Sequence, residues 1–217
     1  MNTALEVLSL NVAIDRIPVL RDVALEVPAG KMAGLIGRNG AGKTTVMRAI
    51  MGLLPFKATR ITADGENIQA LAPYDLARRG ISYMPEDRRL IPALTVEENI
   101  LLPAWANHIP EAKKRLSWIY GLMPEVAEFR QRRAMLLSGG QQKLVALARA
   151  LMPGNKLLLL DEPFEGVAPV LSRRLAEVIG SLRQEGLSVL ISESDHTHSA
   201  HLVDLVYRIE RGVVTAD

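Results

Sequence analysis

The segment GRNGAGKT, residues 37–44, has the composition of a loop that binds phosphate. It matches the pattern G-x-x-x-x-G-K-[ST] and lies between an apolar run, residues 32–36, and a stretch with helical spacing. Glycines let successive backbone N–H groups point at phosphate oxygens, and the amino end of the helix adds a partial positive charge. The Lys43 ammonium would lie beside the β- and γ-phosphates, and the Thr44 hydroxyl would reach Mg²⁺. The candidate nucleotide-binding residues here are Gly37, Arg38, Asn39, Gly40, Ala41, Gly42, Lys43, Thr44 and Thr45.

Two adjacent carboxylates follow four leucines in KLLLLDEP, residues 156–163. The leucines predict a buried strand, and alternate residues of a strand point to opposite faces. Asp161 is therefore a candidate to hold Mg²⁺, directly or through water, and Glu162 to orient or deprotonate the water that attacks the γ-phosphate. The alternative is a helix N-cap after a core strand, which is less favoured beside a phosphate loop. Together the two motifs predict nucleotide hydrolysis, with Lys43 and Glu162 as catalytic residues.

The segment LSGGQQKLVALARAL, residues 137–151, predicts a second site for an anion. At the start of a helix, exposed N–H groups and a hydroxyl would face the ligand, supplied by Ser138, Gly139, Gly140 and Gln141. A single bound nucleotide needs only one such cradle. A second one is useful if it covers the γ-phosphate of a nucleotide held by another subunit, so we expect a head-to-tail pair of chains. The alternative is a helix start without a ligand.

The composition of the 217 residues is that of an ordinary globular protein, 48% hydrophobic and 23% charged. The 26 Lys and Arg residues nearly balance the 24 Asp and Glu residues, so we expect no nucleic-acid partner. The absence of cysteine excludes disulfides, thiolate metal sites and a cysteine nucleophile. The chain start lacks the pattern of a signal peptide, and no apolar run approaches the roughly 20 residues that span a bilayer. We therefore expect a cytoplasmic chain that reaches a membrane only through a partner.

Hydrophobic periodicity assigns these motifs to elements of an α/β fold. Residues 4–30 read as short strands of an antiparallel sheet, and residues 71–151 carry mostly helical spacing. The order then becomes strand 156–161, helix 168–186, strand 187–192, a helix over 198–205, and terminal strands 206–210 and 212–215. Short apolar runs that alternate with helices favour a mostly parallel sheet covered on both faces. We predict one domain, residues 1–217, with a core lobe (1–70 and 152–217) and an inserted helical subdomain (about 71–151).

In this order and spacing, GRNGAGKT, LSGGQQ and LLLLDEP resemble the motifs of the ATP-binding cassette (ABC) family over essentially the whole chain. The phrases LIGRNGAGKTTVMRAIMGLLP, ISYMPEDRRLIPALTVEENILLPA and EPFEGVAP are most similar to ATP-binding subunits of branched-chain amino-acid uptake transporters. The resemblance implies a P-loop nucleoside triphosphatase core that binds ATP and Mg²⁺. It also implies a pair of cassette subunits that sandwiches two ATP molecules and drives membrane permeases. The loop 86–94 and the neighbouring helix would then meet the permease.

Two positions depart from the family pattern. Glu86 stands where many cassettes have a glutamine that senses Mg²⁺; a glutamate can still bind the ion or its water, and the branched-chain subgroup often has one. An exposed loop carboxylate is the alternative. Ile14 stands where an aromatic residue usually stacks on adenine, which gives up a stacking contribution on the order of 1 kcal/mol and predicts weaker nucleotide binding.

The position of the family's γ-phosphate-sensing histidine falls on Ser194, counted back from Asp204 in LVDLVYRIERG. Nearby are His196, His198 and His201. A metal site is disfavoured because His196 and His198 would lie about 200° apart on a helix.

Two interpretations of this histidine cluster remain. In one, His196 reaches into the nucleotide site from two residues downstream. In the other, which we favour, Ser194 or Asp195 caps a helix and the histidines are solvated on its first turns. The second interpretation leaves the chain's own ATP site without a sensing histidine.

These observations lead to two functional hypotheses. The first is an ATPase subunit of an import system for branched-chain amino acids or similar small polar solutes. It would act at the cytoplasmic face of the membrane with permease subunits, a second cassette subunit and, indirectly, an external solute-binding protein. A heterodimer is favoured over a homodimer because Ile14 and Ser194 suggest one weak site. The alternative is a weakly hydrolytic, ATP-dependent dimerisation or regulatory module paired with a more active cassette. A soluble cassette of DNA repair or translation is disfavoured because the chain is one compact cassette.

Overall fold

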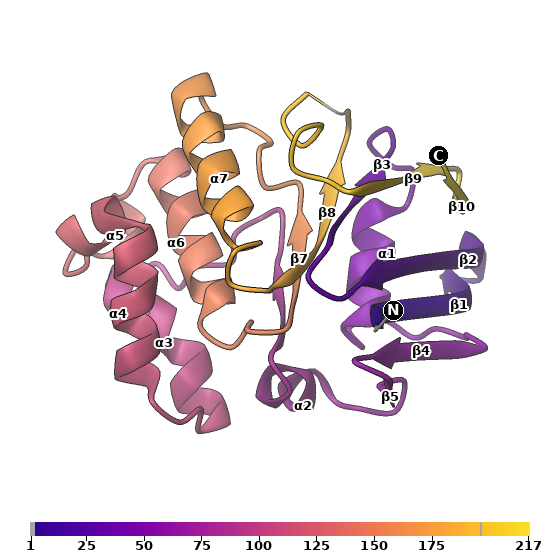
Figure 1. Ribbon diagram of the computed structural model, residues 1–217, viewed down its shortest axis with the longest axis horizontal. Coiled ribbons are helices and arrows are strands. Elements are labelled where there is room, and N and C mark those ends of the chain that lie inside the picture. The colour runs from indigo at the N-terminus through magenta and orange to yellow at the C-terminus, as the bar shows by residue number, and fades with distance from the viewer. Residues whose placement is uncertain (1–2, 196) are drawn as a thin grey trace.

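A six-stranded sheet runs through the middle of the molecule (Figure 1). The computed structural model describes residues 3–195 and 197–217. Five strands are parallel, and the last one joins the edge antiparallel to its neighbour. In spatial order the strands are β10 (Val213–Ala216), β9 (Leu205–Glu210), β3 (Met32–Ile36), β8 (Ser188–Glu193), β7 (Leu157–Asp161) and β6 (Ile81–Met84).

A second, antiparallel sheet comes from the first third of the chain and lies on the right in Figure 1. In spatial order it holds β2 (Ile17–Pro28), β1 (Thr3–Ile14), β4 (Arg60–Ala63) and β5 (Glu66–Asn67). The predicted alternation holds in β2, where Val23, Leu25 and Val27 are buried and the residues between them are exposed. Helix α1 (Lys43–Ile50) lies between the two sheets and buries Val46 and Met47.

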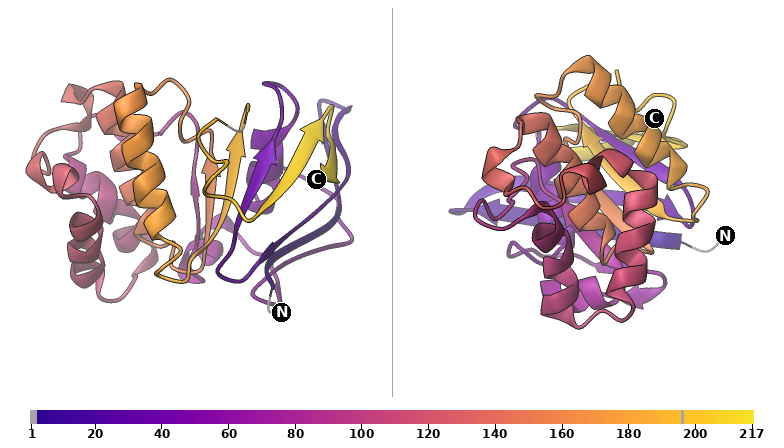
Figure 2. Two further views of the ribbon diagram at one scale, coloured as in Figure 1. Left: turned by 45° about the horizontal axis from the view of Figure 1, so that its top comes forward. Right: turned by 90° about the vertical axis from the view of Figure 1, so that its left-hand side faces the viewer.

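The other face of the six-stranded sheet is covered by helices (Figures 1 and 2). These are α3 (Val96–Asn107), α4 (Ala112–Leu122), α5 (Pro124–Glu128), a short 3₁₀ turn (Ala134–Leu136), α6 (Gly139–Leu151) and α7 (Pro169–Ser181). The short α2 (Pro73–Arg78) precedes β6. No helix within residues 3–195 and 197–217 combines the length and apolar character needed to cross a membrane.

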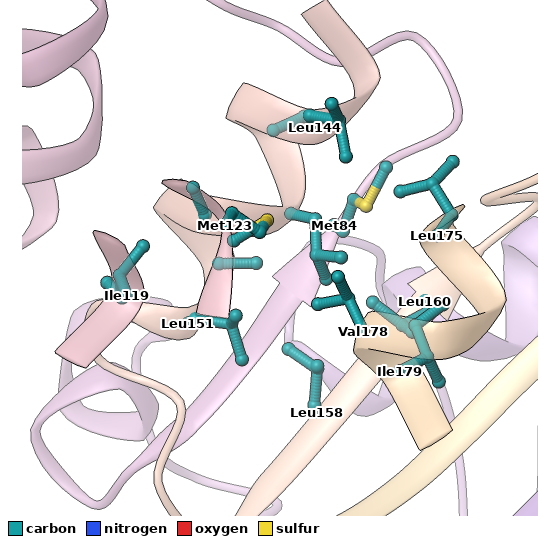
Figure 3. Packing of buried hydrophobic residues seen from close by; sticks show 14 of the residues in the cluster. Met84, Ile119, Met123, Leu144, Leu151, Leu158, Leu160, Leu175, Val178 and Ile179 are labelled. Atoms are coloured by element: carbon teal, nitrogen blue, oxygen red, sulfur yellow. The ribbon is translucent and has the colours of Figure 1, made fainter. Parts of the chain in front are cut away.

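The four leucines of β7 supply two separate hydrophobic cores. Leu158 and Leu160 pack with the helices, in the cluster that also holds Leu144, Leu151 and Val178 (Figure 3). Leu157 and Leu159 face the other way and pack with α1 and the antiparallel sheet. This division follows from the alternation of side chains along a strand. It places the end of β7, and therefore Asp161, at the boundary between the two cores.

The predicted α/β architecture is confirmed, with an N-terminal antiparallel sheet, a mostly parallel sheet and helices on both faces of the latter. The interval 71–151 differs in one respect. It is mostly helical but contains β6, which pairs in parallel with β7 at the edge of the central sheet. The sequence signal was weak because ISYM is only four residues long, and a short apolar run does not distinguish a strand from a helix. The division into a core lobe and a helical subdomain stays a prediction, in which β6 belongs with the core sheet.

The helix predicted over 198–205 is wrong, because the described residues between β8 and β9 form turns. Local side-chain hydrogen bonds compete with helix formation there. Asp195 Oδ1 accepts a hydrogen bond from the Thr197 N–H at 2.8 Å, and the Ser199 hydroxyl donates to the Glu193 carboxylate. Asp204 then accepts from the Met32 N–H at 2.9 Å and leads the chain into β9.

Candidate functional site

The phosphate-loop segment, residues 37–42, connects β3 to α1 where the parallel strands end. Two of its glycines are required by close packing. A Cβ atom on Gly37 would lie 2.2 Å from the Ile209 carbonyl oxygen, and one on Gly42 would lie 2.8 Å from the Leu20 side chain. Gly42 also has a φ of +115°, a conformation that side chains rarely allow. The loop is therefore held tightly against β9 and β2.

Lys43 and Glu162 form a buried ion pair beside this loop. The Lys43 ammonium lies 2.9 Å from Glu162 Oε1, and it donates to the carbonyl oxygens of Gly37 and, at 3.1 Å, Arg38. Both side chains are almost completely buried. Burial raises the pKa of Glu162, and the hydrogen bond and charge of Lys43 oppose that rise. The pair places a cation that could bind an anion and a candidate general base side by side, with both side chains buried.

Asp161 is fully buried at the end of β7, and three hydroxyl groups surround its carboxylate. Oδ1 accepts hydrogen bonds from the Ser192 hydroxyl at 2.8 Å and the Thr44 hydroxyl at 3.2 Å, while Oδ2 accepts from the Tyr83 hydroxyl at 2.8 Å. Within the described parts of the chain, no Lys, Arg or His pairs with this carboxylate. A buried carboxylate without a counter-cation, beside a threonine hydroxyl, is an oxygen donor set that suits Mg²⁺.

Glu86 is exposed on the loop after β6 and lines a cavity of about 290 Å³ beside the phosphate-loop segment. The same cavity is lined by Asn39, Gly40, Gly42, Lys43, Thr44, Thr45 and Glu162. No group of three or more His, Cys, Asp or Glu side chains within 3–195 and 197–217 gathers as a metal cage. Mg²⁺ does not need one, because it commonly binds through one or two carboxylates together with substrate phosphates.

Ile14 is not brought to this cavity. It ends β1, is 44% exposed and pairs with the exposed Ile17 across the hairpin. Val19 lines the cavity instead. The predicted contact between Ile14 and adenine therefore stays a prediction.

The predicted second cradle lies at the start of α6, where Ser138 and Gly139 are exposed. Ser138 and Gln141 form a capping box: the Gln141 N–H donates to the serine hydroxyl at 3.3 Å, and the Ser138 N–H donates to Gln141 Oε1 at 3.0 Å. Gly140 packs so tightly that an added Cβ would lie 2.1 Å from the Leu171 side chain. Neither the serine nor the glycines line the cavity beside Lys43. This position suits a cradle that serves another chain.

Ser194 lies inside the site. Its hydroxyl oxygen is 3.2 Å from Glu162 Oε1 and 2.8 Å from Asn39 Oδ1. His196 lies outside the described residues. The half-buried His198 packs against Phe164, with ring centroids 5.3 Å apart, and His201 is exposed. His198 and His201 are therefore not on the first turns of a helix, because this segment forms turns.

Four residues near the site were missed in the sequence. Tyr83 and Ser192 bond to Asp161 from the two neighbouring strands, and Val19 lines the cavity. Lys143 is buried on α6 and donates to the Glu162 carbonyl oxygen at 2.6 Å; burial lowers its pKa. Lys143 directly precedes the apolar residues 144–148, which was a signal in the sequence. The contacts of the other three residues depend on which strands lie side by side.

Comparison with known proteins gives a consistent result. The sequence profile of the ABC transporter family matches residues 20–165. The chain is 36% identical over 197 residues to the high-affinity branched-chain amino acid transport ATP-binding protein BraG of Pseudomonas aeruginosa, covering 91% of this chain and 84% of that one. It is 34% identical over 200 residues to the lipopolysaccharide export system ATP-binding protein LptB of Escherichia coli, covering 91% and 83%. Among solved structures, the ADP conformation of the ATP-binding cassette MJ1267 superposes with a TM-score of 0.86 at 26% identity, over 99% of this chain and 90% of that one.

Proposed function

This chain belongs to the ATP-binding cassette family, the ATPases of ABC transporters, and we propose that it drives an import system for branched-chain amino acids or similar small polar solutes. Members of the family bind ATP, normally with Mg²⁺, and work with membrane permease subunits. One observation carries the catalytic part of the proposal. The Lys43–Glu162 ion pair and the Thr44–Asp161 hydrogen bond lie side by side at the ends of β3 and β7.

In this proposal Lys43 binds the β- and γ-phosphates and thereby leaves Glu162, which becomes free to accept a proton from the attacking water. Thr44 and Asp161 would hold Mg²⁺, and Glu86 lines one cavity together with both of them. The ion neutralises charge on the phosphates when it is bound. The exposed Ser138 and Gly139 at the start of α6 complete the site of a partner cassette.

The permease would dock on the loop 86–94 and its surroundings. Three large apolar side chains gather there: Ile91 is 40% exposed, and Met135 and Leu136 are each 61% exposed. The Met135 N–H donates to the Pro92 carbonyl oxygen at 3.1 Å, which holds the two segments together. Such a docking site would place the chain at the cytoplasmic face of the membrane, where an external solute-binding protein acts on it only through the permease.

The import assignment is supported by the phrases shared with branched-chain subunits and by the likeness to BraG. The likeness to LptB supports an export system as the second candidate. A weakly hydrolytic partner module is a third candidate, and it is favoured by one observation: at the expected position of the sensing histidine, the Ser194 hydroxyl lies beside Glu162.

The test is ATP-dependent uptake of radiolabelled leucine by proteoliposomes that contain the assembled transporter. We expect uptake with the wild-type chain and a strong loss with Glu162→Gln. The matched control is Glu177→Gln, on the exposed face of α7, which should transport normally. Absence of leucine uptake by a wild-type complex that hydrolyses ATP would contradict the import assignment. Equal uptake with Glu162→Gln would contradict the role of this site.

A further inference from the structure

The hydroxyl of Tyr83 reaches the candidate metal-binding carboxylate from the side opposite to Ser192. β7 lies between β8 and β6, and Asp161 stands in register with Ser192 on β8. Tyr83 stands in register with Leu159, two residues earlier on β7, so its long side chain extends along the strand to Asp161. The two neighbouring strands therefore each contribute one hydroxyl donor to the same carboxylate.

These donors divide the two carboxylate oxygens between them. Oδ1 is shared by Ser192 and Thr44, at 2.8 and 3.2 Å, whereas Oδ2 accepts from Tyr83 alone among the described residues, at 2.8 Å. A carboxylate held through both oxygens cannot rotate about its bond to the β-carbon without breaking a hydrogen bond.

We propose that Tyr83 is a positioning residue that fixes the orientation of the Asp161 carboxylate for Mg²⁺. Partners that hydrogen-bond to a metal-binding carboxylate orient it and tune its affinity for the ion. Thr44 alone cannot do this, because its hydroxyl would turn to the ion when Mg²⁺ is bound. Tyr83 and Ser192 would then remain to hold the carboxylate.

Tyr83 also lies between the proposed metal site and the loop 86–94, which is predicted to meet the permease. Tyr83 lines a cavity of about 210 Å³ together with Thr44 and Asp161 of the proposed metal site and with Glu86, Asp87 and Arg89 of the loop. Only two residues, Met84 and Pro85, separate Tyr83 from Glu86 along the chain. A change at Tyr83 would therefore reach both sides of the site.

The inference rests on the proposed Mg²⁺ site and is tested by metal binding to the isolated full chain. Mn²⁺ replaces Mg²⁺, a non-hydrolysable ATP analogue replaces ATP, and electron paramagnetic resonance measures free Mn²⁺. For Tyr83→Phe we expect Mn²⁺ affinity to fall about 10-fold, the lower end of the range for loss of an outer-shell partner. Affinity for the analogue without metal should be unchanged, because the phosphate loop is intact.

The chain offers a matched control in Tyr120, whose hydroxyl donates to Glu97 Oε2 at 3.0 Å away from the site. Tyr120→Phe removes the same kind of tyrosine–carboxylate hydrogen bond and should leave Mn²⁺ affinity at the wild-type value. Equal Mn²⁺ affinity in Tyr83→Phe and Tyr120→Phe would overturn the role of Tyr83. A wild-type chain that binds the analogue but no Mn²⁺ would overturn the proposed metal site as well.

Discussion

At the scale of single residues, the three carboxylates of the candidate site have different surroundings. Glu86 is exposed, Asp161 is surrounded by hydroxyl donors, and Glu162 is paired with Lys43. A fourth, Glu193, is buried at the end of β8, and it accepts from the Ser199 hydroxyl. Its backbone carbonyl oxygen accepts from the Gly37 N–H at 3.1 Å, which ties it to the phosphate loop. A change in the protonation of the Glu193 carboxyl group would therefore act next to the phosphate loop.

Glu193 predicts a specific pH dependence of stability. Burial raises the pKa of Glu193 to about 7, the hydrogen bonds from Ser199 oppose the rise, and the charges of Asp195 and Glu162 add to it. Between pH 4.5 and about 7 the unfolded chain therefore ionises this carboxyl while the folded chain keeps its proton. The folded state loses stability as the pH rises through this window, by an amount on the order of 3 kcal/mol.

We expect Glu193→Gln to remove this loss. Its melting temperature should be close to that of the wild type at pH 5 and should exceed it increasingly up to pH 8, measured by circular dichroism. Glu177→Gln, on the protein surface, should show no such trend. A constant difference between Glu193→Gln and the wild type across this pH range would show that Glu193 titrates normally.

At the scale of elements, two helices begin with the same capping motif, but only one of these motifs lies in a proposed binding site. α3 starts with a capping box between Thr95 and Glu98, and α6 with one between Ser138 and Gln141. The second box holds the exposed residues that we propose to complete the partner's ATP site. Its serine would therefore have two roles, the stability of α6 and contact with a nucleotide of the other chain.

The two boxes allow those roles to be separated. Thr95→Ala and Ser138→Ala should each lower the free energy of unfolding by about 1 kcal/mol, the usual cost of losing a helix cap. Only Ser138→Ala should also weaken the ATP-dependent association of the two cassette subunits, measured by analytical ultracentrifugation without permease. Equal association of both variants would mean that Ser138 serves its own helix alone.

The elements that could be predicted from the sequence are those with a local signal. The apolar runs of β3 and β7 and the glycines of residues 37–42 can be recognised from the local sequence alone. The structure confirms their predicted positions. β6 was missed because four residues carry little periodicity. The turns after β8 were missed because Asp195 and Ser199 make hydrogen bonds that spacing does not reveal.

The features of the candidate site can likewise be divided into those that the sequence predicted and those that it did not. Lys43 and Glu162 come from different motifs, and the sequence predicted that both act at one γ-phosphate but did not predict their ion pair. The bonds of Tyr83 and Ser192 to Asp161 were not predictable, because they depend on the strand order β8-β7-β6. The roles assigned to Ile14, Ser194 and the residues at the start of α6 stay predictions.

At the scale of the whole molecule, the proposed nucleotide site and the proposed cradle for the partner's nucleotide belong to helices on opposite faces of the central sheet. The phosphate loop starts α1 on one face, and the start of α6 lies on the other. Since one chain carries both a nucleotide site and an exposed cradle, pairing with a second cassette would use both. Ser194 beside Glu162 then predicts an asymmetric pair, in which this chain's own site is the slower one.

The most direct test measures ATP hydrolysis by the assembled transporter with Glu162→Gln in this chain, and separately with the matching substitution in the partner cassette. The account predicts that both lower the turnover and that the substitution in the partner lowers it more. Equal losses would contradict the asymmetric pair. Unchanged turnover with Glu162→Gln in this chain would contradict the central claim that ATP is hydrolysed at the site built by Lys43 and Glu162.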